Sequence, residues 1–174
     1  MAAVKNAIGA RISSAPAECL SHLNLQERPV MQAVRLIHAG KMALCAELED
    51  IADRLPGNVD ELACLSLAER LLPGLRHAHA YEENVLFPLY DQIASYDRAS
   101  LSTDRLRTEH VADAFFADDI TAMLFELGHA GRLRDPETFG FMLRGFFEGL
   151  RRHVAFEVEH VAAVIADRTV RSLT

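Results

Sequence analysis

Apolar positions recur every three or four residues through most of the chain, which is the period of an amphipathic helix. Three breaks interrupt this pattern after residue 28: Pro56-Gly57, the polar run 95–103 and the segment 131–136. No segment alternates strictly between apolar and polar residues, as a half-buried strand would. The pattern therefore predicts four long helices, over residues 29–55, 60–88, 102–129 and 135–168.

Capping residues support these boundaries. Asp60 and Asp135 are expected N-caps, and Pro136 follows Asp135 at a first helical position, where proline is tolerated. Two prolines fall inside the second helical pattern. We expect Pro73 to kink that helix and Pro88 to end or bend it, because each removes a backbone hydrogen bond.

The fold class follows from the number of helices and the shortness of their connections. Four helices joined by short loops pack as antiparallel neighbours. We therefore predict an all-α protein, an up-down-up-down four-helix bundle over residues 29–168, with a tail at 169–174. Residues 1–28 precede the bundle as an N-terminal extension, and they contain enough apolar residues for an extra helix; a frayed tail is the alternative.

Each apolar stripe carries a histidine, and two of these histidines are followed by a glutamate four residues later. Residues four apart lie on one helix face, about 5–6 Å apart at Cβ. A carboxylate buried without a partner is very costly, and a metal ion is one such partner. The candidate metal ligands are His38, His79, Glu83, His110, His153 and Glu157.

The candidate ligands are also level along the bundle. His38 lies 17 residues before Leu55, and His79 lies 19 residues after Asp60, so the two face each other across the first hairpin. His110 and His153 face each other in the same way across the second hairpin. Four imidazoles and two carboxylates are too many donors for a closed tetrahedral zinc site and suit two bridged metal ions.

At these positions the chain resembles the hemerythrin-like, HHE cation-binding family, over about residues 29–168. The resemblance rests on His38, on HAYEENVLFP from His79, on Glu109-His110 and on HVAFE from His153. It implies two metal ions, iron in preference to manganese or zinc, joined by an oxo or hydroxo bridge. It also implies that the four histidines are terminal ligands, that Glu83 and Glu157 bridge the ions, and that an open position binds dioxygen.

The third helix departs from the oxygen-carrying hemerythrins, which have a second histidine four residues after the first. Ala114 occupies that position here. His160 is the candidate replacement ligand because it shares the stripe of His153 and Glu157, although it lies one turn deeper. Its alternative role is to hydrogen-bond a ligand.

Three neighbouring residues are expected outside the ligand set. His77 is two residues from His79 and therefore faces another side of the helix, where we expect exposure. Glu82 and Glu109 lie beside ligands and are expected on solvated faces, with a hydrogen bond to a ligand as the alternative.

The resemblance favours a binding protein that takes up dioxygen or a related diatomic such as NO, for sensing, storage or delivery. A binding protein of this kind does not need to turn over a substrate. The alternative is a di-iron oxidoreductase, or a protein that handles iron or repairs iron centres.

The composition of the chain narrows the range of expected binding partners and locations. Eighteen Lys and Arg against 25 Asp and Glu give a net charge of −7, which argues against nucleic acid. The longest apolar stretches are far shorter than the roughly 20 residues of a membrane span. Three irregularly spaced cysteines and the lack of a signal-peptide pattern favour the cytoplasm. We expect a monomer or homodimer.

Overall fold

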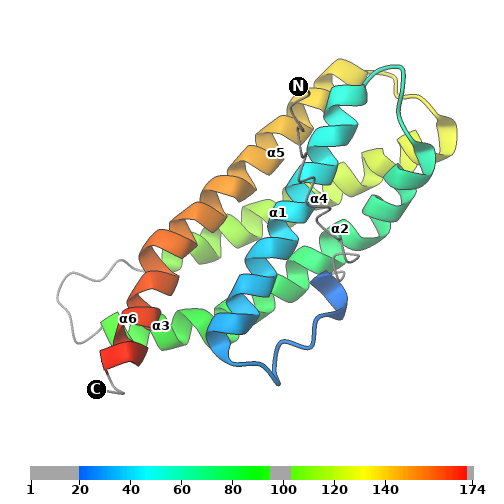
Figure 1. The fold of residues 1–174 in the computed structure, drawn as a ribbon. Helices are drawn as coiled ribbons and strands as arrows, with labels where there is room; N and C mark the ends of the chain where they lie inside the picture. Colours follow the sequence, from blue (N-terminus) through cyan, green and yellow to red (C-terminus); the bar gives the residue numbers. More distant parts are fainter. Residues whose placement is uncertain (1–19, 95–102, 172–174) are drawn as a thin grey trace, which may run out of the picture.

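The computed structural model describes residues 20–94 and 103–171 and contains helices and turns in these two segments, with no strand among them. The long helices pack side by side (Figure 1). The predicted all-α four-helix bundle is confirmed. The four helices are α1 (Val30–Arg54), α2 (Glu61–Tyr81), α4 (Asp104–Ala130) and α5 (Pro136–Phe156).

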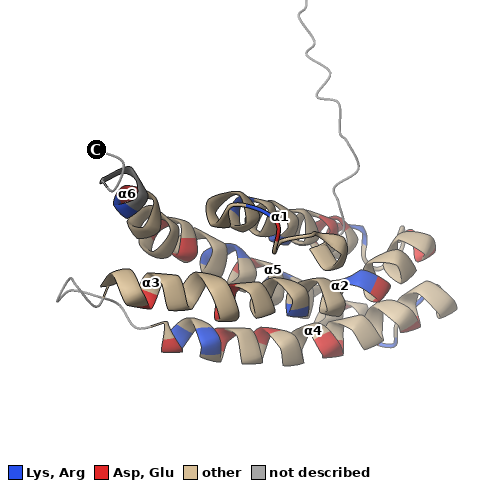
Figure 2. Ribbon diagram, turned by 90° about the horizontal axis from the view of Figure 1, so that it is seen from below, with Lys and Arg blue, Asp and Glu red and all other residues tan. Residues whose placement is uncertain are grey.

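The helices pack in two principal pairs. α1 lies mainly against α5, and α2 lies mainly against α4. Leucine, alanine and phenylalanine side chains from all four helices form one continuous core. Figure 2 shows acidic and basic residues interspersed along the helices. None of the helices described is long and apolar enough to cross a membrane.

Side-chain caps set where two of the helices begin. The carboxylate of Asp60 accepts a hydrogen bond from the Ala63 N–H at 3.1 Å, and that of Asp135 accepts one from the Thr138 N–H at 3.0 Å. These contacts satisfy amide groups that have no partner inside the helix. Both predicted N-caps are confirmed. α4 ends at Gly131, whose φ of 66° lies in the left-handed region.

The second helical run continues past Pro88, where we expected it to end or bend. α2 runs unbroken through Pro73, and a π-helical turn, η2 (Glu82–Leu86), leads into α3 (Phe87–Ala94). Pro88 therefore does not end the helix. The N–H of Phe87 donates to the Glu82 carbonyl, five residues back, so the wider turn lies directly before the residue that lacks an N–H.

The fourth helical run has the same construction. A second π-helical turn, η3 (Glu157–Ala162), separates α5 from α6 (Ala163–Arg171). α3 and α6 lie against each other at one end of the bundle (Figure 1). Each π turn begins at a fully buried glutamate. Such turns frequently mark functional sites.

The last part of the N-terminal extension packs on the bundle. A short 3₁₀ turn, η1 (Leu20–His22), lies against α1 and α2. Gly40 and Gly74 make room for Leu20, since a Cβ added at either glycine would lie 2.5 Å or 3.1 Å from its side chain. The rest of the possible extra helix falls in residues 1–19, outside the described residues.

Candidate metal centre

Four buried side chains converge where the π turns begin. One donor atom from each of Glu82, His110, His153 and Glu157 lies within 4.8 Å of the other three. Metal–nitrogen and metal–oxygen bonds of about 2.0–2.2 Å place ligands of one ion at such separations. These residues come from η2, α4, α5 and η3, so the packing of the whole bundle assembles the cluster.

Two outer carboxylates orient the histidines of this cluster. Nδ1 of His110 lies 2.8 Å from Oε1 of Glu83, and Nδ1 of His153 lies 3.0 Å from Oε2 of Glu109. A carboxylate can only accept, so each Nδ1–H donates to it. In a neutral imidazole the Nε2 atom then carries the free lone pair. Both Nε2 atoms face buried carboxylates inside the bundle: that of His110 lies 3.2 Å from Oε2 of Glu82, and that of His153 lies 3.5 Å from Oε1 of Glu157.

The resulting donor set fits a metal ion. The Nε2 atoms of His110 and His153 lie 3.2 Å apart, a separation at which two lone pairs repel unless a cation or proton stands between them. Nε2 of His79 and Oε1 of Glu157 are also buried, and neither has a hydrogen-bond partner. Buried polar atoms rarely remain unpaired, and a metal ion would satisfy them.

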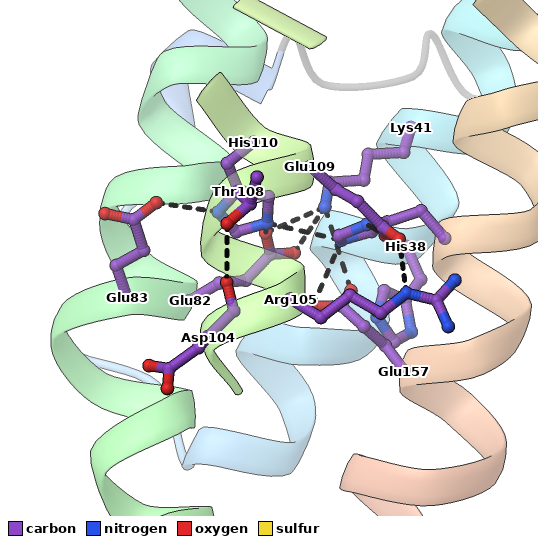
Figure 3. A network of polar contacts seen from close by, with 11 residues as sticks. His38, Lys41, Glu82, Glu83, Asp104, Arg105, Thr108, Glu109, His110 and Glu157 are labelled. Atoms are coloured by element: carbon purple, nitrogen blue, oxygen red, sulfur yellow. Dashed lines mark hydrogen bonds and ion pairs between the residues drawn. The ribbon is translucent and has the colours of Figure 1, made fainter. Parts of the chain in front are cut away.

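A buried lysine stands beside the same carboxylates. Lys41 of α1 is fully buried, and its Nζ donates to both carboxylate oxygens of Glu82 at 2.7 Å. Nζ also lies 3.7 Å from Oε2 of Glu157. Burial acts to lower the pKa of Lys41, but the charges of Glu82 and Glu157 outweigh it and raise the pKa. Dashed lines in Figure 3 join the ammonium group of Lys41 to the carboxylates of Glu82 and Glu157.

The same environment shifts the neighbouring groups. Burial, reinforced by the positive charge of Lys41, lowers the pKa of His79 strongly, so that its ring is neutral. Burial acts to lower the pKa of His153, but the nearby carboxylates of Glu157 and Glu82 together outweigh it and raise the pKa. Burial acts to raise the pKa of Glu157, but Lys41 and the histidine contacts hold it well below its usual value. Glu157 is therefore a carboxylate.

Two more of the predicted residues join the cluster. Nε2 of His38 lies 3.1 Å from Oε2 of Glu157. The ring of His79 stacks on that of His110, with 3.8 Å between the centroids. The structure thus brings together His38, His79, His110, His153 and Glu157, as the level spacing along the helices predicted.

The positions of Glu82 and Glu83 correct the sequence prediction. Glu82, expected on a solvated face, is fully buried in the cluster, whereas Glu83, expected to bridge two ions, lies outside it. The side chain of Glu83 is 36% exposed and contacts the outer side of His110 (Figure 3). Glu82 is three residues from His79 and Glu83 four, so both lie near its face of the helix. The carboxylate of Glu82, rather than that of Glu83, pairs with the buried ammonium of Lys41.

His160 lies apart from this cluster. Its side chain is 39% exposed, its Nε2 atom lies 3.8 Å from Glu159, and its ring packs on Phe156. Ala114, the position that His160 was expected to replace, packs against the hydrophobic core. His160 is thus outside the group of residues that could share one ion.

Two expectations of solvation also need correction. His77 is half-buried, and its Nε2 atom contacts the Leu23 carbonyl at 3.0 Å, which ties the N-terminal extension to α2. Glu109 is half-buried and hydrogen-bonds His153, which was the alternative role considered for it.

Lys41 is the residue of the cluster that sequence reasoning missed. A signal was present, because the steps from His38 to Lys41, Cys45 and Leu48 alternate between three and four residues. Lys41 therefore lies on the apolar stripe of α1. Lysine is almost never fully buried unless it is paired, so this position predicts a buried carboxylate opposite it.

A pocket of about 370 Å³ between α4 and α5 reaches the cluster. His153 and its partner Glu109 form part of the wall. Arg105, Asp113 and Arg152 give the pocket a polar, mixed-charge lining. The pocket therefore lies directly beside one residue of the cluster.

Comparison with known proteins agrees with this geometry. The hemerythrin HHE cation-binding domain matches residues 30–165, which include every residue of the cluster. No curated protein and no solved structure shows significant similarity to the chain. Because the domain match spans most of the sequence, the chain belongs to the hemerythrin HHE cation-binding domain family.

Proposed function

We propose that the protein binds iron at the cluster of Glu82, His110, His153 and Glu157 and uses it to bind dioxygen or a related diatomic such as NO. The observation that carries the proposal is the pair of inward-facing Nε2 atoms of His110 and His153, 3.2 Å apart and beside the buried carboxylates of Glu82 and Glu157. Iron bound there would supply an open coordination position for a small ligand.

The protein's own residues prepare the site for such a ligand. Glu83 and Glu109 hold the rings of His110 and His153 in the tautomer that binds metal. Phe87 stacks on His110 at 5.4 Å, and its buried side chain limits solvent around the donors. The polar pocket beside His153, with a volume of about 370 Å³, has room for a small molecule.

An oxidoreductase is the second candidate, and Asp113 favours it. Asp113 lines the pocket that reaches His153, and burial raises the pKa of its carboxyl group against the opposing charges of His153 and Lys41. A carboxyl group with a raised pKa beside the centre is a candidate proton donor for the reduction of oxygen or peroxide. Repair of iron centres and a cytoplasmic location remain predictions from the sequence.

Anaerobic loading with Fe(II) tests the proposal. We expect stable retention of iron and a change in the absorption spectrum when one equivalent of O₂ or NO is added. Reversal when the gas is removed would support a binding protein, and continued consumption of O₂ or peroxide would support the oxidoreductase. No retained iron, zinc or manganese in a folded protein would refute the metal-site proposal.

A further inference from the structure

Lys41 places a permanent positive charge where the predicted dinuclear centre requires metal. Its Nζ atom contacts both oxygens of Glu82 at 2.7 Å and lies 3.7 Å from Glu157. The ammonium thus stands between the two buried carboxylates, which is the place of an ion that two glutamates would share. The side chain is fully buried, so water does not screen its charge.

We propose that Lys41 takes the place of one metal ion, so that the centre holds a single ion, bound chiefly by His110, His153 and Glu157. The inference rests on the proposed function, because it assumes that the cluster binds metal. Glu82 then serves mainly as the partner of Lys41, and its carboxylate borders the ion.

The balance of charge supports a single ion. The cluster contains two carboxylates, those of Glu82 and Glu157, and one ammonium group. For these fully buried groups, one divalent ion brings the net formal charge to plus one, whereas a second would bring it to plus three. Like charges at such short range repel strongly where the dielectric constant is low. The carboxylates of Glu83 and Glu109 lie on the outer side of the histidines and are about one third exposed, so water screens their charges.

The donor set agrees with this count. With Glu82 engaged by Lys41 through both oxygens, two histidines and one carboxylate remain around one point. Two histidines and a carboxylate form the usual ligand set of mononuclear non-haem iron(II) sites. His38 contacts Glu157 and borders these donors as a hydrogen-bonding neighbour. The ring of His79 stacks on that of His110, and its unpartnered Nε2 atom remains available to the same ion.

The test is metal stoichiometry in the full chain, loaded to saturation with Fe(II) and, separately, with Mn(II). We expect about one ion per chain in the parent protein and the electron paramagnetic resonance spectrum of isolated Mn(II), without coupling between two ions. Two ions with a coupled spectrum would overturn the inference and leave the proposed function intact. No bound ion would refute both.

Variants of Lys41 test whether its charge is the cause. Lys41→Arg keeps the charge and should retain one ion, whereas Lys41→Met removes the charge and should raise the stoichiometry from about one to about two. A Lys41→Met protein that folds and still holds one ion would overturn the role of Lys41. The double variant Lys41→Met/Glu82→Gln removes both charges and should fold and keep one ion. Loss of its metal would contradict the proposed ligands, even if the single variant does not fold.

Discussion

The ammonium group of Lys41 donates to both carboxylate oxygens of Glu82 at 2.7 Å, and neither side chain is in contact with solvent. This ion pair joins α1 to η2 at the centre of the candidate metal site. A buried pair of this kind need not add much net stability, because both charges have lost their hydration. Its loss is costly when only one partner is removed.

Removal of one partner of this pair should therefore destabilise the metal-free protein. We expect Lys41→Met to lower the free energy of unfolding by about 3–5 kcal/mol, because Glu82 is left buried and charged. Lys41→Met/Glu82→Gln should recover much of that loss. Urea unfolding in the presence of a chelator measures the double-mutant cycle. A double variant as unstable as the sum of the two single variants would show that the pair is not coupled.

Glu83 should behave as a hydrogen-bond partner of a ligand. We expect Glu83→Gln to weaken metal affinity by about 10–100-fold, because it loosens the ring of His110. Glu109→Gln is the matched control, since Glu109 makes the same contact with His153. Glu157→Gln should abolish retention, because it removes a buried donor. Competition with a chromophoric chelator measures all three, and equal losses for Glu83→Gln and Glu157→Gln would restore Glu83 as a ligand.

His160 should be dispensable for metal binding. Its ring is partly exposed and packs on Phe156, outside the donor cluster. His160→Ala should therefore retain the parent's metal content, whereas His153→Ala should lose it. Elemental analysis after gel filtration compares the two. If His160→Ala releases metal, the ring of His160 must move inward when metal binds.

Two glycines should respond in opposite directions to alanine. Gly131 ends α4 at a φ of 66°, a conformation that alanine rarely adopts, so Gly131→Ala should destabilise the protein by about 1 kcal/mol or more. Gly145 lies within α5, and nothing lies within 4 Å of an added Cβ. Gly145→Ala should stabilise by about 0.5–1 kcal/mol. Thermal unfolding of both variants measures the effect, and a shift of the same sign in both would contradict the backbone argument.

The Asp135 cap should contribute a pH-dependent part of the stability. Hydrogen bonds from the backbone and side chain of Thr138 lower the pKa of Asp135 below its value in the unfolded chain. A lowered pKa means that the contribution is complete above the unfolded value of about 3.9 and is lost as the pH falls through the folded value. Asp135→Ala should therefore melt below the parent at pH 6, and the difference should shrink in stronger acid.

Metal-free protein must be used for this measurement, because acid also displaces metal from histidine. Thr138→Val is the companion variant, since it removes the hydroxyl that donates to Asp135 at 2.8 Å. It should reduce the pH-dependent part without abolishing it, because the backbone bond remains. A difference between Asp135→Ala and the parent that does not change with pH would contradict the role of ionised Asp135.

The sequence by itself determined the bundle and most of the inward-facing donors. Residues spaced by three and four define one face of each helix, whatever the neighbouring helices are, so the stripes and the caps Asp60 and Asp135 were readable. The same periodicity placed His38, His79, His110, His153 and Glu157 in the interior. It did not separate Glu82 from Glu83, because steps of three and four residues from His79 are both compatible with one face.

Only the tertiary structure decided that choice. Lys41 is far from Glu82 along the chain, and the packing of α1 on the second helical run brings its ammonium to that carboxylate. Glu83 then contacts the outer side of His110. The π turns set the backbone positions from which the side chains of Glu82 and Glu157 enter the core. These outcomes depend on which buried charges of opposite sign come into contact. Such contacts form between helices, so the periodicity of a single helix does not predict them.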